Sequence, residues 1–229
     1  MNLYELFYRT EEREGVEKAQ VQKRPEGMAL FWLAISQNPW DMIKLNLAFL
    51  ISCIPIITIP AALAALFGMN YRFLLGKHID FLSDYWELFK ESFKRATVIG
   101  LLSMILMFAI SFAIYFYATL AASELMFAFV AVLLSMLLLS VITMSFYVYP
   151  MLILTDLRMV QIIKNAFYLT IVCLPRNALT LVVIAVLLII AIFSFPISLL
   201  IYAVMGFSLF GIIIAFSTYK GIMKYVIRD

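Results

Sequence analysis

Long stretches without charge alternate with short charged segments along this chain of 229 residues. Four stretches of 27, 28, 31 and 43 residues contain no Asp, Glu, Lys or Arg; they are residues 45–71, 96–123, 125–155 and 177–219. A bilayer crossing takes about 20 apolar residues in a helix. The first three stretches therefore each suit one crossing. The fourth would reach about 65 Å as a single helix, so it predicts two crossings with a turn near Pro196.

The first uncharged stretch contains two prolines. Proline removes a backbone donor and clashes with the preceding helical turn, so Pro55 and Pro60 predict a break within residues 45–63. If the stretch is one kinked span, the chain makes five crossings and places a basic N-terminal segment outside. If the prolines mark a turn, residues 40–55 and 60–76 form a short helical hairpin and the N-terminus is inside. We favour the hairpin, which gives six helices, although each of its arms makes only about 25 Å of helix.

The amino-acid composition indicates that the chain lies in a lipid bilayer rather than in water. Hydrophobic residues make up 65% of the chain, and the mean hydropathy is +1.02. Only 14% of the residues are charged, compared with about 25% in soluble domains. A soluble protein of this length has too little interior to hide so much apolar surface, so the expected class is an all-α, polytopic transmembrane helical bundle whose first partner is the lipid bilayer.

The same numbers argue against several other classes of function. A net charge of only +3 gives no reason to expect a nucleic acid partner. One histidine and two distant cysteines provide no metal-ligand spacing, and no glycine-rich phosphate loop is present. The serines are dispersed without a neighbouring base. We therefore expect no enzyme, no metal and no cofactor.

Charge also divides the chain into regions. Residues 1–40 are predicted to form a charged cytoplasmic tail that ends in an interfacial apolar segment, in which Trp32 and Trp40 suit the headgroup layer. Residues 41–229 are predicted to form a single transmembrane helical domain. Asn38 is expected to cap a helix that begins at the proline following it.

Two charged loops, near 77–95 and 156–176, carry apolar residues at helical spacing. Each predicts an amphipathic helix that lies on the membrane surface and leads into the next span. Basic residues gather in these two loops and at the C-terminus, whereas the link near Glu124 and the turn near Pro196 contain none. The positive-inside tendency therefore predicts that both loops and the C-terminus are cytoplasmic, and the hairpin arrangement places the N-terminus there as well.

The proline break is the best candidate for an intramembrane site. Discontinuous helices expose backbone at membrane depth and can bind substrates there. Asn46, Pro55, Thr58 and Pro60 are the candidate functional residues. A structural alternative is that Asn46 joins helices through hydrogen bonds, while Thr58 caps the helix that Pro60 begins.

A second set of residues lies at the predicted cytoplasmic ends of the spans. They are candidates for an interface with a partner protein and comprise Pro150, Asp156, Lys164, Asn165 and Pro175. Asp156 is expected either to cap the following helix or to pair with a nearby basic residue, a contact worth less than about 1 kcal/mol if exposed.

Three segments in order resemble the YesL-like family of small bacterial membrane proteins, found mostly in Firmicutes. They are LNLAFLISCIPIITIPAALAAL (45–66), FKESFKRA (89–96) and YPMLILTDLRMVQIIKNAFYLTIVCLPRNAL (149–179). The resemblance implies a multi-pass protein of the bacterial plasma membrane. Genes of this family commonly sit beside carbohydrate-uptake ABC transporters and polysaccharide-degrading enzymes.

Two functions follow from this resemblance and from the missing chemical site. The first is a non-enzymatic accessory or scaffold protein in carbohydrate uptake, with the membrane subunits of an ABC importer as partners. The alternative is a small multi-pass transporter or permease with its site at the broken helices. Because a single copy has too few helices to enclose a pore, the alternative also implies a homo-oligomer with its pore between subunits.

Overall fold

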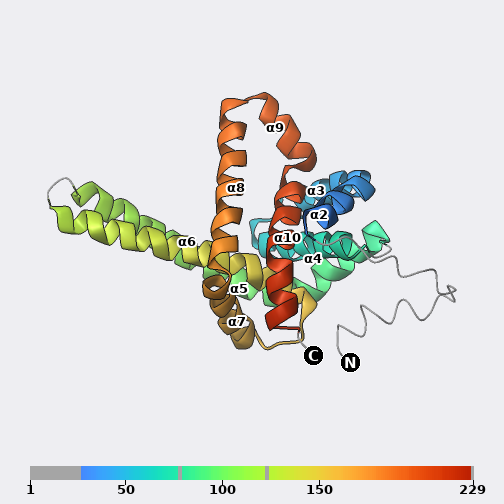
Figure 1. Cartoon of the computed structure of the whole chain (residues 1–229), viewed down its shortest axis with the longest axis horizontal. Coiled ribbons are helices and arrows are strands. Elements are labelled where there is room, and N and C mark those ends of the chain that lie inside the picture. Colours follow the sequence, from blue (N-terminus) through green and yellow to red (C-terminus); the bar gives the residue numbers. More distant parts are fainter. Residues whose placement is uncertain (1–26, 77–78, 122–123, 228–229) are drawn as a thin grey trace.

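The computed structural model describes residues 27–76, 79–121 and 124–227, and every regular element in these ranges is helical (Figure 1). The elements are α2 (Met28–Gln37), α3 (Pro39–Ser52), the 3₁₀ turn η1 (Ile56–Thr58), α4 (Ile59–Leu75), α5 (Phe81–Leu120), α6 (Leu125–Leu154), α7 (Met159–Val172), α8 (Leu174–Phe193), α9 (Ile197–Ile201), the π-helix η2 (Tyr202–Gly206) and α10 (Phe207–Tyr225). The predicted all-α transmembrane bundle is confirmed. The first 26 residues of the predicted tail lie outside the described ranges.

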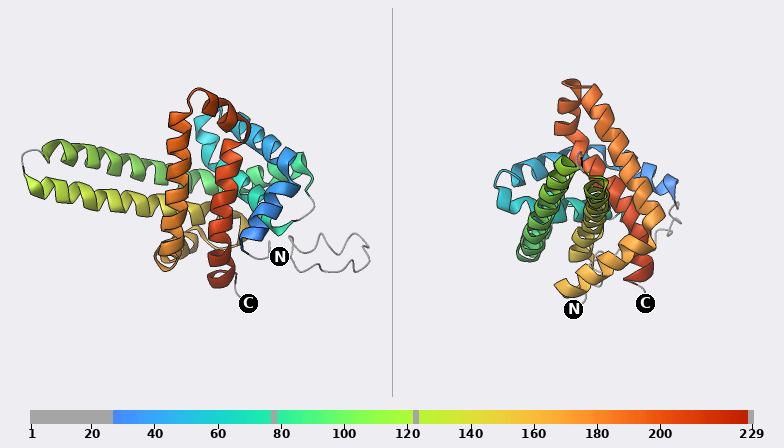
Figure 2. Two further views of the ribbon diagram at one scale, coloured as in Figure 1. Left: turned by 45° about the horizontal axis from the view of Figure 1, so that its top comes forward. Right: turned by 90° about the vertical axis from the view of Figure 1, so that its left-hand side faces the viewer.

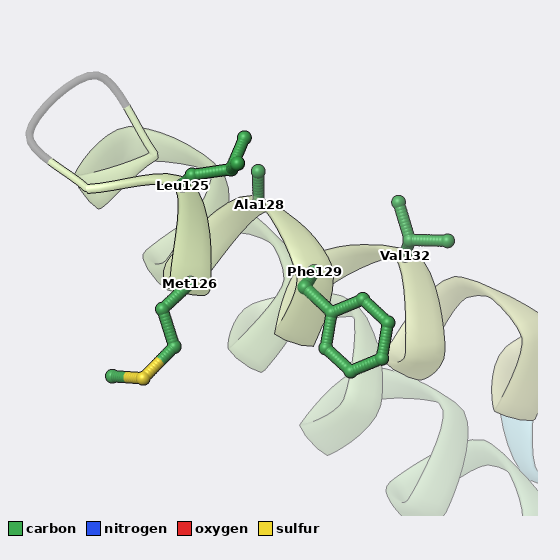
Figure 3. Close-up of a pocket in the computed structure, with 5 residues that line it drawn as sticks. All are labelled: Leu125, Met126, Ala128, Phe129 and Val132. Atoms are coloured by element: carbon green, nitrogen blue, oxygen red, sulfur yellow. The ribbon is translucent and has the colours of Figure 1, made fainter.

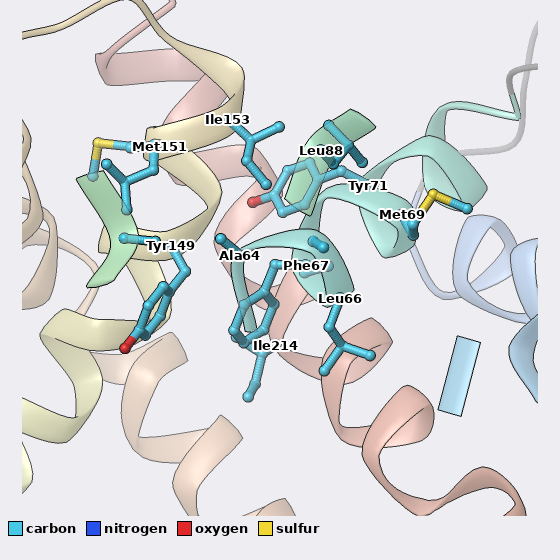
Figure 4. Packing of buried hydrophobic residues seen from close by; sticks show 14 of the residues in the cluster. Ala64, Leu66, Phe67, Met69, Tyr71, Leu88, Tyr149, Met151, Ile153 and Ile214 are labelled. Atoms are coloured by element: carbon cyan, nitrogen blue, oxygen red, sulfur yellow. The ribbon is translucent and has the colours of Figure 1, made fainter. Parts of the chain in front are cut away.

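Helix α4 forms the centre of the molecule. It packs against α5, α6 and α10, and its small residues Ala61, Ala62, Ala64 and Ala65 are completely buried. Small side chains allow neighbouring helices to approach closely, as they do in membrane bundles. Larger side chains fill the space around them: Phe67 stacks on Tyr149 of α6 with ring centroids 6.1 Å apart (Figure 4).

The proline break is confirmed as a turn between two separate helices. Helix α3 ends at Ser52 and α4 begins at Ile59, close to the predicted arms of 40–55 and 60–76. The two helices pack against each other, as the predicted hairpin requires. However, the 14 residues of α3 make only about 21 Å of helix, well short of a bilayer core of about 30 Å.

Within the described ranges, five segments are long and apolar enough to cross a membrane: Ile56–Leu75, Phe81–Leu120, Leu125–Leu154, Leu174–Phe193 and Ile197–Tyr225. Helix α3 is not among them, so it is the one predicted helix whose length falls short. The predicted turn near Pro196 is confirmed, because α8 ends at Phe193 and α9 begins at Ile197.

Helices α5 and α6 form a long hairpin that projects from the body of the molecule (Figures 1 and 2). Their 40 and 30 residues reach about 60 Å and 45 Å. Beyond the body the two helices contact each other, and Tyr117 stacks on Phe127 near the tip. Helices α8 and α10 run across the direction of this hairpin (Figure 2).

The two predicted amphipathic helices exist, and part of each apolar face packs inside the protein. In the first turns of α5, Tyr85 and Leu88 are buried against the body. In α7, Ile162, Ala166 and Leu169 are completely buried, whereas Val160 and Phe167 stay exposed. That these helices lie on the membrane surface stays a prediction.

Candidate functional site

Asn46 joins α3 to a part of the chain more than 150 residues away. Its side-chain nitrogen donates to the carbonyl oxygens of Tyr202 and Ala203, at 3.3 and 2.6 Å. Its side-chain oxygen accepts from the backbone nitrogens of Phe207 and Ser208, at 2.9 and 3.2 Å. The side chain is completely buried. Every polar atom of this amide is therefore occupied by backbone.

These contacts are located at the π-helix η2, between α9 and α10. A π-helical turn changes the register of the backbone hydrogen bonds. Some backbone groups at the turn therefore lack the partner that a regular α-helix would give them. In an apolar environment each such group needs another partner. Asn46 supplies four hydrogen bonds at this register change, which makes it the clamp between two interrupted segments. The structural alternative for Asn46, a link between helices, is the one that this geometry favours.

Thr58 closes the turn at the other interruption. Its hydroxyl oxygen lies 2.5 Å from the carbonyl oxygens of both Ser52 and Pro55, so its single proton is shared between them. The side chain makes no capping bond to α4, although Thr58 is the residue before the helix starts. Its predicted role as a side-chain cap was therefore wrong. The same holds for Asn38, whose amide donates to the carbonyl of Ala34 in α2 instead.

The two prolines of the break have different surroundings. Pro55 is exposed, next to the exposed side chains of Ile54, Ile56 and Ile57. Pro60 is buried against Gly100 of α5, where an added Cβ would lie 2.3 Å from the Cβ of Pro60. Pro60 therefore lies where α4 and α5 approach each other most tightly, rather than at a ligand site.

Several buried polar residues between α4 and α10 were not predicted from the sequence. Asn70 of α4 donates to the carbonyl of Leu66 and lies against Gly211, where an added Cβ would be 2.4 Å from its amide nitrogen. Within the described ranges, the Asn70 side-chain oxygen and the Ser208 hydroxyl have no hydrogen-bond partner. Tyr71 follows on the same helix and shares a hydrogen bond of 2.8 Å with Thr218. Together they form a polar seam between α4 and α10.

The residues predicted for a partner interface do not form one surface. Pro150 is buried inside α6, whereas Asp156, Lys164 and Pro175 are exposed and Asn165 is half-buried. Asp156 is not the cap of α7: Arg158 occupies that position, and its backbone N–H donates to the side chain of Gln161 at 2.9 Å. The structure thus separates Pro150 from the other four residues.

An ion pair that the sequence did not reveal fixes the start of α5 to the end of α4. Arg72 lies 2.6 Å from Asp84, and their side chains are only 15% and 18% exposed. The second oxygen of Asp84 accepts from the backbone N–H of Asp80, at 3.1 Å, and so caps α5. This pair gives the first turns of α5 a fixed position beside the core.

A cavity of about 730 Å³ lies between α2, α4, α8 and α10. Its lining residues are Gly27, Met28, Leu30, Phe31, Leu74, Leu75, Arg176, Leu179, Thr180, Val183, Leu187, Ile213, Phe216, Ser217, Tyr219 and Lys220. The lining includes none of the four residues predicted at the proline break. Arg176 and Lys220 are at opposite ends of the longest uncharged stretch. The predicted turn near Pro196 brings those two ends of the stretch together. That turn was therefore the signal in the sequence that Arg176 and Lys220 lie near each other.

A second hollow, at the tip of the α5–α6 hairpin, has a different character. It is lined by Leu125, Met126, Ala128, Phe129 and Val132, all on one side of the loop, in α6 (Figure 3). None of these side chains is polar, so the hollow offers no group to orient a ligand. It is part of the exposed apolar surface of the hairpin.

Neither metal nor disulfide chemistry is built into the described part of the chain. Residues 27–76, 79–121 and 124–227 contain no group of three or more His, Cys, Asp or Glu side chains placed to hold a metal ion. Cys53 and Cys173 are both free and half-buried.

The fold and these sites define a multi-pass helical membrane protein whose interrupted helices are joined by buried hydrogen bonds. Among known families, the model described as "Protein of unknown function, DUF624" matches residues 42–116, which cover most of α3, all of α4 and most of α5. YesL-like proteins belong to that family. The chain matches no curated protein and no solved structure.

Proposed function

We propose that this chain is a non-enzymatic accessory or scaffold protein of the bacterial plasma membrane, and that it binds the membrane subunits of a carbohydrate ABC importer. The observation that carries the proposal is the projecting α5–α6 hairpin. Its distal part leaves the body of the molecule and presents large apolar side chains outward, among them Phe108, Phe112 and Phe129. A helical pair extended in this way offers a long surface to another membrane protein.

The polar groups at the proline break favour this function over a permease whose site lies at that break. A transporter needs polar groups free to bind a substrate at membrane depth. The amide of Asn46, the best candidate for such a group, is used completely by the backbone around η2. Thr58 is likewise occupied by the carbonyl groups of its own turn.

The resemblance to the YesL-like family of Firmicutes supports the choice of partner. Genes of that family commonly sit beside carbohydrate-uptake ABC transporters, and the match to residues 42–116 covers two of the segments that carry the resemblance. The distribution of basic residues supports a cytoplasmic C-terminus and, in the hairpin arrangement, a cytoplasmic N-terminus. In that orientation the tip of the α5–α6 hairpin faces outward.

Co-purification tests the proposal. The tagged full-length chain is co-expressed with a carbohydrate ABC importer from the same genome and extracted in a mild detergent. We expect the two membrane subunits of the importer to be retained in stoichiometric amounts. Replacing Phe108 and Phe112 by alanine should reduce the retained importer at least fivefold, because both side chains are exposed on one face of the hairpin.

A matched variant distinguishes this contact from non-specific hydrophobic association. Ile192 and Phe193 are equally exposed at the end of α8, so the I192A/F193A variant removes a similar apolar area elsewhere and should retain the importer. Loss of the importer in both variants, or no importer bound to the unmodified chain, would overturn the proposal. Sugar uptake by vesicles that contain this chain alone would favour the transporter alternative. Hairpin-dependent self-association would identify a homo-oligomer instead.

A further inference from the structure

The cavity between α2, α4, α8 and α10 has charge at only one end. Arg176 lies in the first turn of α8 and Lys220 near the end of α10, so both cations are at the open end of the α8–α10 hairpin, away from the turn near Pro196 (Figure 1). Both side chains are exposed, and within the described ranges neither forms an ion pair with an acidic residue. No acidic residue of the described ranges lines the cavity. Among these residues, the cationic end therefore has positive charge without a counter-charge.

Away from this end the lining becomes apolar. Along α8 it continues through Leu179 and Val183 to Leu187, eleven residues or about 16 Å beyond Arg176. Along α10 it continues from Lys220 through Phe216 to Ile213. The groove thus has the polarity of an amphiphile, with a cationic mouth and a hydrocarbon-like interior.

Two hydroxyl groups separate these halves. Thr180 and Ser217 share a hydrogen bond of 2.5 Å that ties α8 to α10, and both side chains are buried. Because they satisfy each other, they close the floor of the groove without presenting an unpaired polar group to its apolar part. The outer wall, in contrast, is open: Leu179 is 65% and Val183 38% exposed.

We propose that this groove is a binding site for an anionic phospholipid. Its headgroup phosphate would lie between Arg176 and Lys220, and one acyl chain would lie along Val183, Leu187 and Ile213. Three observations support this occupant: the two uncompensated cations, the apolar groove beneath them, and the outer wall that opens toward the surrounding membrane. Basic pockets between transmembrane helices on the cytoplasmic side are suited to anionic headgroups. The cavity volume of about 730 Å³ is within the range of about 300–1,000 Å³ that ligand sites occupy.

The site gives the lipid a structural part in the molecule. Helix α2 contributes Phe31 to the groove, and this ring also contacts Phe216 of α10 at 5.4 Å between centroids. A lipid in the groove would therefore contact α2, α8 and α10 at once. Binding is expected to stabilise the packing of α2 and of the α8–α10 hairpin on α4.

Lipid binding to the purified full-length chain tests the inference. The probes are phosphatidylglycerol and phosphatidylcholine with identical acyl chains, measured by native mass spectrometry in a neutral detergent. We expect phosphatidylglycerol to bind about 10- to 30-fold more tightly, because two cations near one phosphate each add electrostatic attraction. The R176Q/K220Q variant should lose this preference and bind both lipids alike.

The control removes the same charge elsewhere. Arg158 and Lys164 are exposed on α7 and do not line the groove, so R158Q/K164Q should keep the preference for phosphatidylglycerol. Phosphatidylglycerol with a photoreactive acyl chain should label peptides that contain Val183 or Ile213. Equal loss in both double variants, no preference in the unmodified chain, or labelling confined to the α5–α6 hairpin would overturn the proposal. Displacement of the lipid by inorganic phosphate alone would show a free-anion site instead.

Discussion

At the scale of single residues, the most consequential side chain is Asn46. Its carboxamide has one donor and one acceptor end, and the backbone at η2 uses both: the carbonyl groups at the start of η2 accept, and the N–H groups at the start of α10 donate. Among side chains, only Asn and Gln combine two N–H donors with a carbonyl acceptor in one planar group. The position therefore requires this chemistry rather than simply a polar residue.

Replacing Asn46 by alanine should destabilise the protein by about 2–4 kcal/mol, because buried backbone groups around η2 lose their partners. The measurement is thermal unfolding of the purified chain in detergent, read by size-exclusion chromatography. Asn165→Ala is the control, because the side chain of Asn165 is half-buried and makes no hydrogen bond within the described ranges. That control should change stability by less than about 0.5 kcal/mol. Equal effects of the two substitutions would contradict the clamp.

The sequence predicted Asn46 as a candidate but not its partners, and the reason is physical. Its partners are backbone groups more than 150 residues away, and backbone groups are the same whatever residue carries them. The segment YAVMG also has no proline or other local signal that would predict a π-helix. In contrast, proline blocks a helical hydrogen bond directly, so the break at Pro55 and the turn near Pro196 were predictable.

At the scale of helices, α4 and α5 approach each other closely at one glycine. Pro60, in the first turn of α4, lies against Gly100 of α5, and the proline ring has no rotamer that could move away. Gly68 of α4 lies instead against the flexible ends of Ile153 and Leu88. Two glycines on adjoining helices therefore tolerate an added methyl group differently.

Gly100→Ala should destabilise the protein by about 1–3 kcal/mol, even though alanine favours a helix by about 1 kcal/mol. The added Cβ would lie 2.3 Å from the Cβ of Pro60, so the two helices must move apart. Gly68→Ala places its Cβ 2.8 Å from the Cδ1 of Ile153, which can rotate, so its effect should be smaller. Thermal unfolding in detergent compares the two variants. A G100A variant as stable as G68A would show that the α4–α5 contact is looser than described.

The ion pair between Arg72 and Asp84 is the second fixed point between these helices. Both side chains are mostly buried, so removing one partner leaves a charge in poor contact with water. We expect D84N to lower the free energy of unfolding by about 1–3 kcal/mol. The R72Q/D84N double variant should lose clearly less stability than the sum of the two single variants. D80N is the control, because the contact of Asp80 with Asp84 uses its backbone N–H. Additive effects in this double-mutant cycle would show that the pair contributes no coupling.

Helix positions were predictable because the charge-free stretches have the length of a bilayer crossing. Where the amphipathic faces pack was not predictable. The spacing of Tyr85 and Leu88 shows only that one face is apolar, and lipid and protein accept such a face equally well. The three-dimensional arrangement of α4, not a local pattern, decides that this face lies inside the protein.

At the scale of the whole molecule, the α5–α6 hairpin and the α8–α10 hairpin share one electrostatic feature. Each turns at an uncharged or acidic tip, near Glu124 and near Pro196, and each has its basic residues at the opposite end. The positive-inside tendency predicts that both tips are outside and both basic ends in the cytoplasm. The side of the N-terminus then depends only on whether α3 and α4 together make an even or odd number of crossings.

Cysteine labelling of intact cells decides this number. In a background with C53A and C173A, E124C should react with an impermeant thiol reagent, whereas K224C should react only after the cells are opened. If α3 and α4 form a hairpin that enters and leaves on the cytoplasmic side, E14C behaves like K224C. We expect this outcome, because six basic residues precede the first long uncharged stretch and their transfer across the membrane is unfavourable.

The opposite result has an equally definite structural meaning. If E14C and E124C both label in intact cells, the chain crosses the membrane once between residues 27 and 76. The segment Ile56–Leu75 is long enough to make that crossing by itself, and α3, which packs against α4, would then lie within the bilayer together with the turn at Thr58. The exposed isoleucines around Pro55 would face lipid on the way, and the carbonyl groups that Thr58 ties together would need that hydrogen bond because lipid offers none. Thr58→Val should then destabilise the protein about as strongly as Asn46→Ala, whereas in the hairpin arrangement, with the turn near water, it should cost less than about 1.5 kcal/mol.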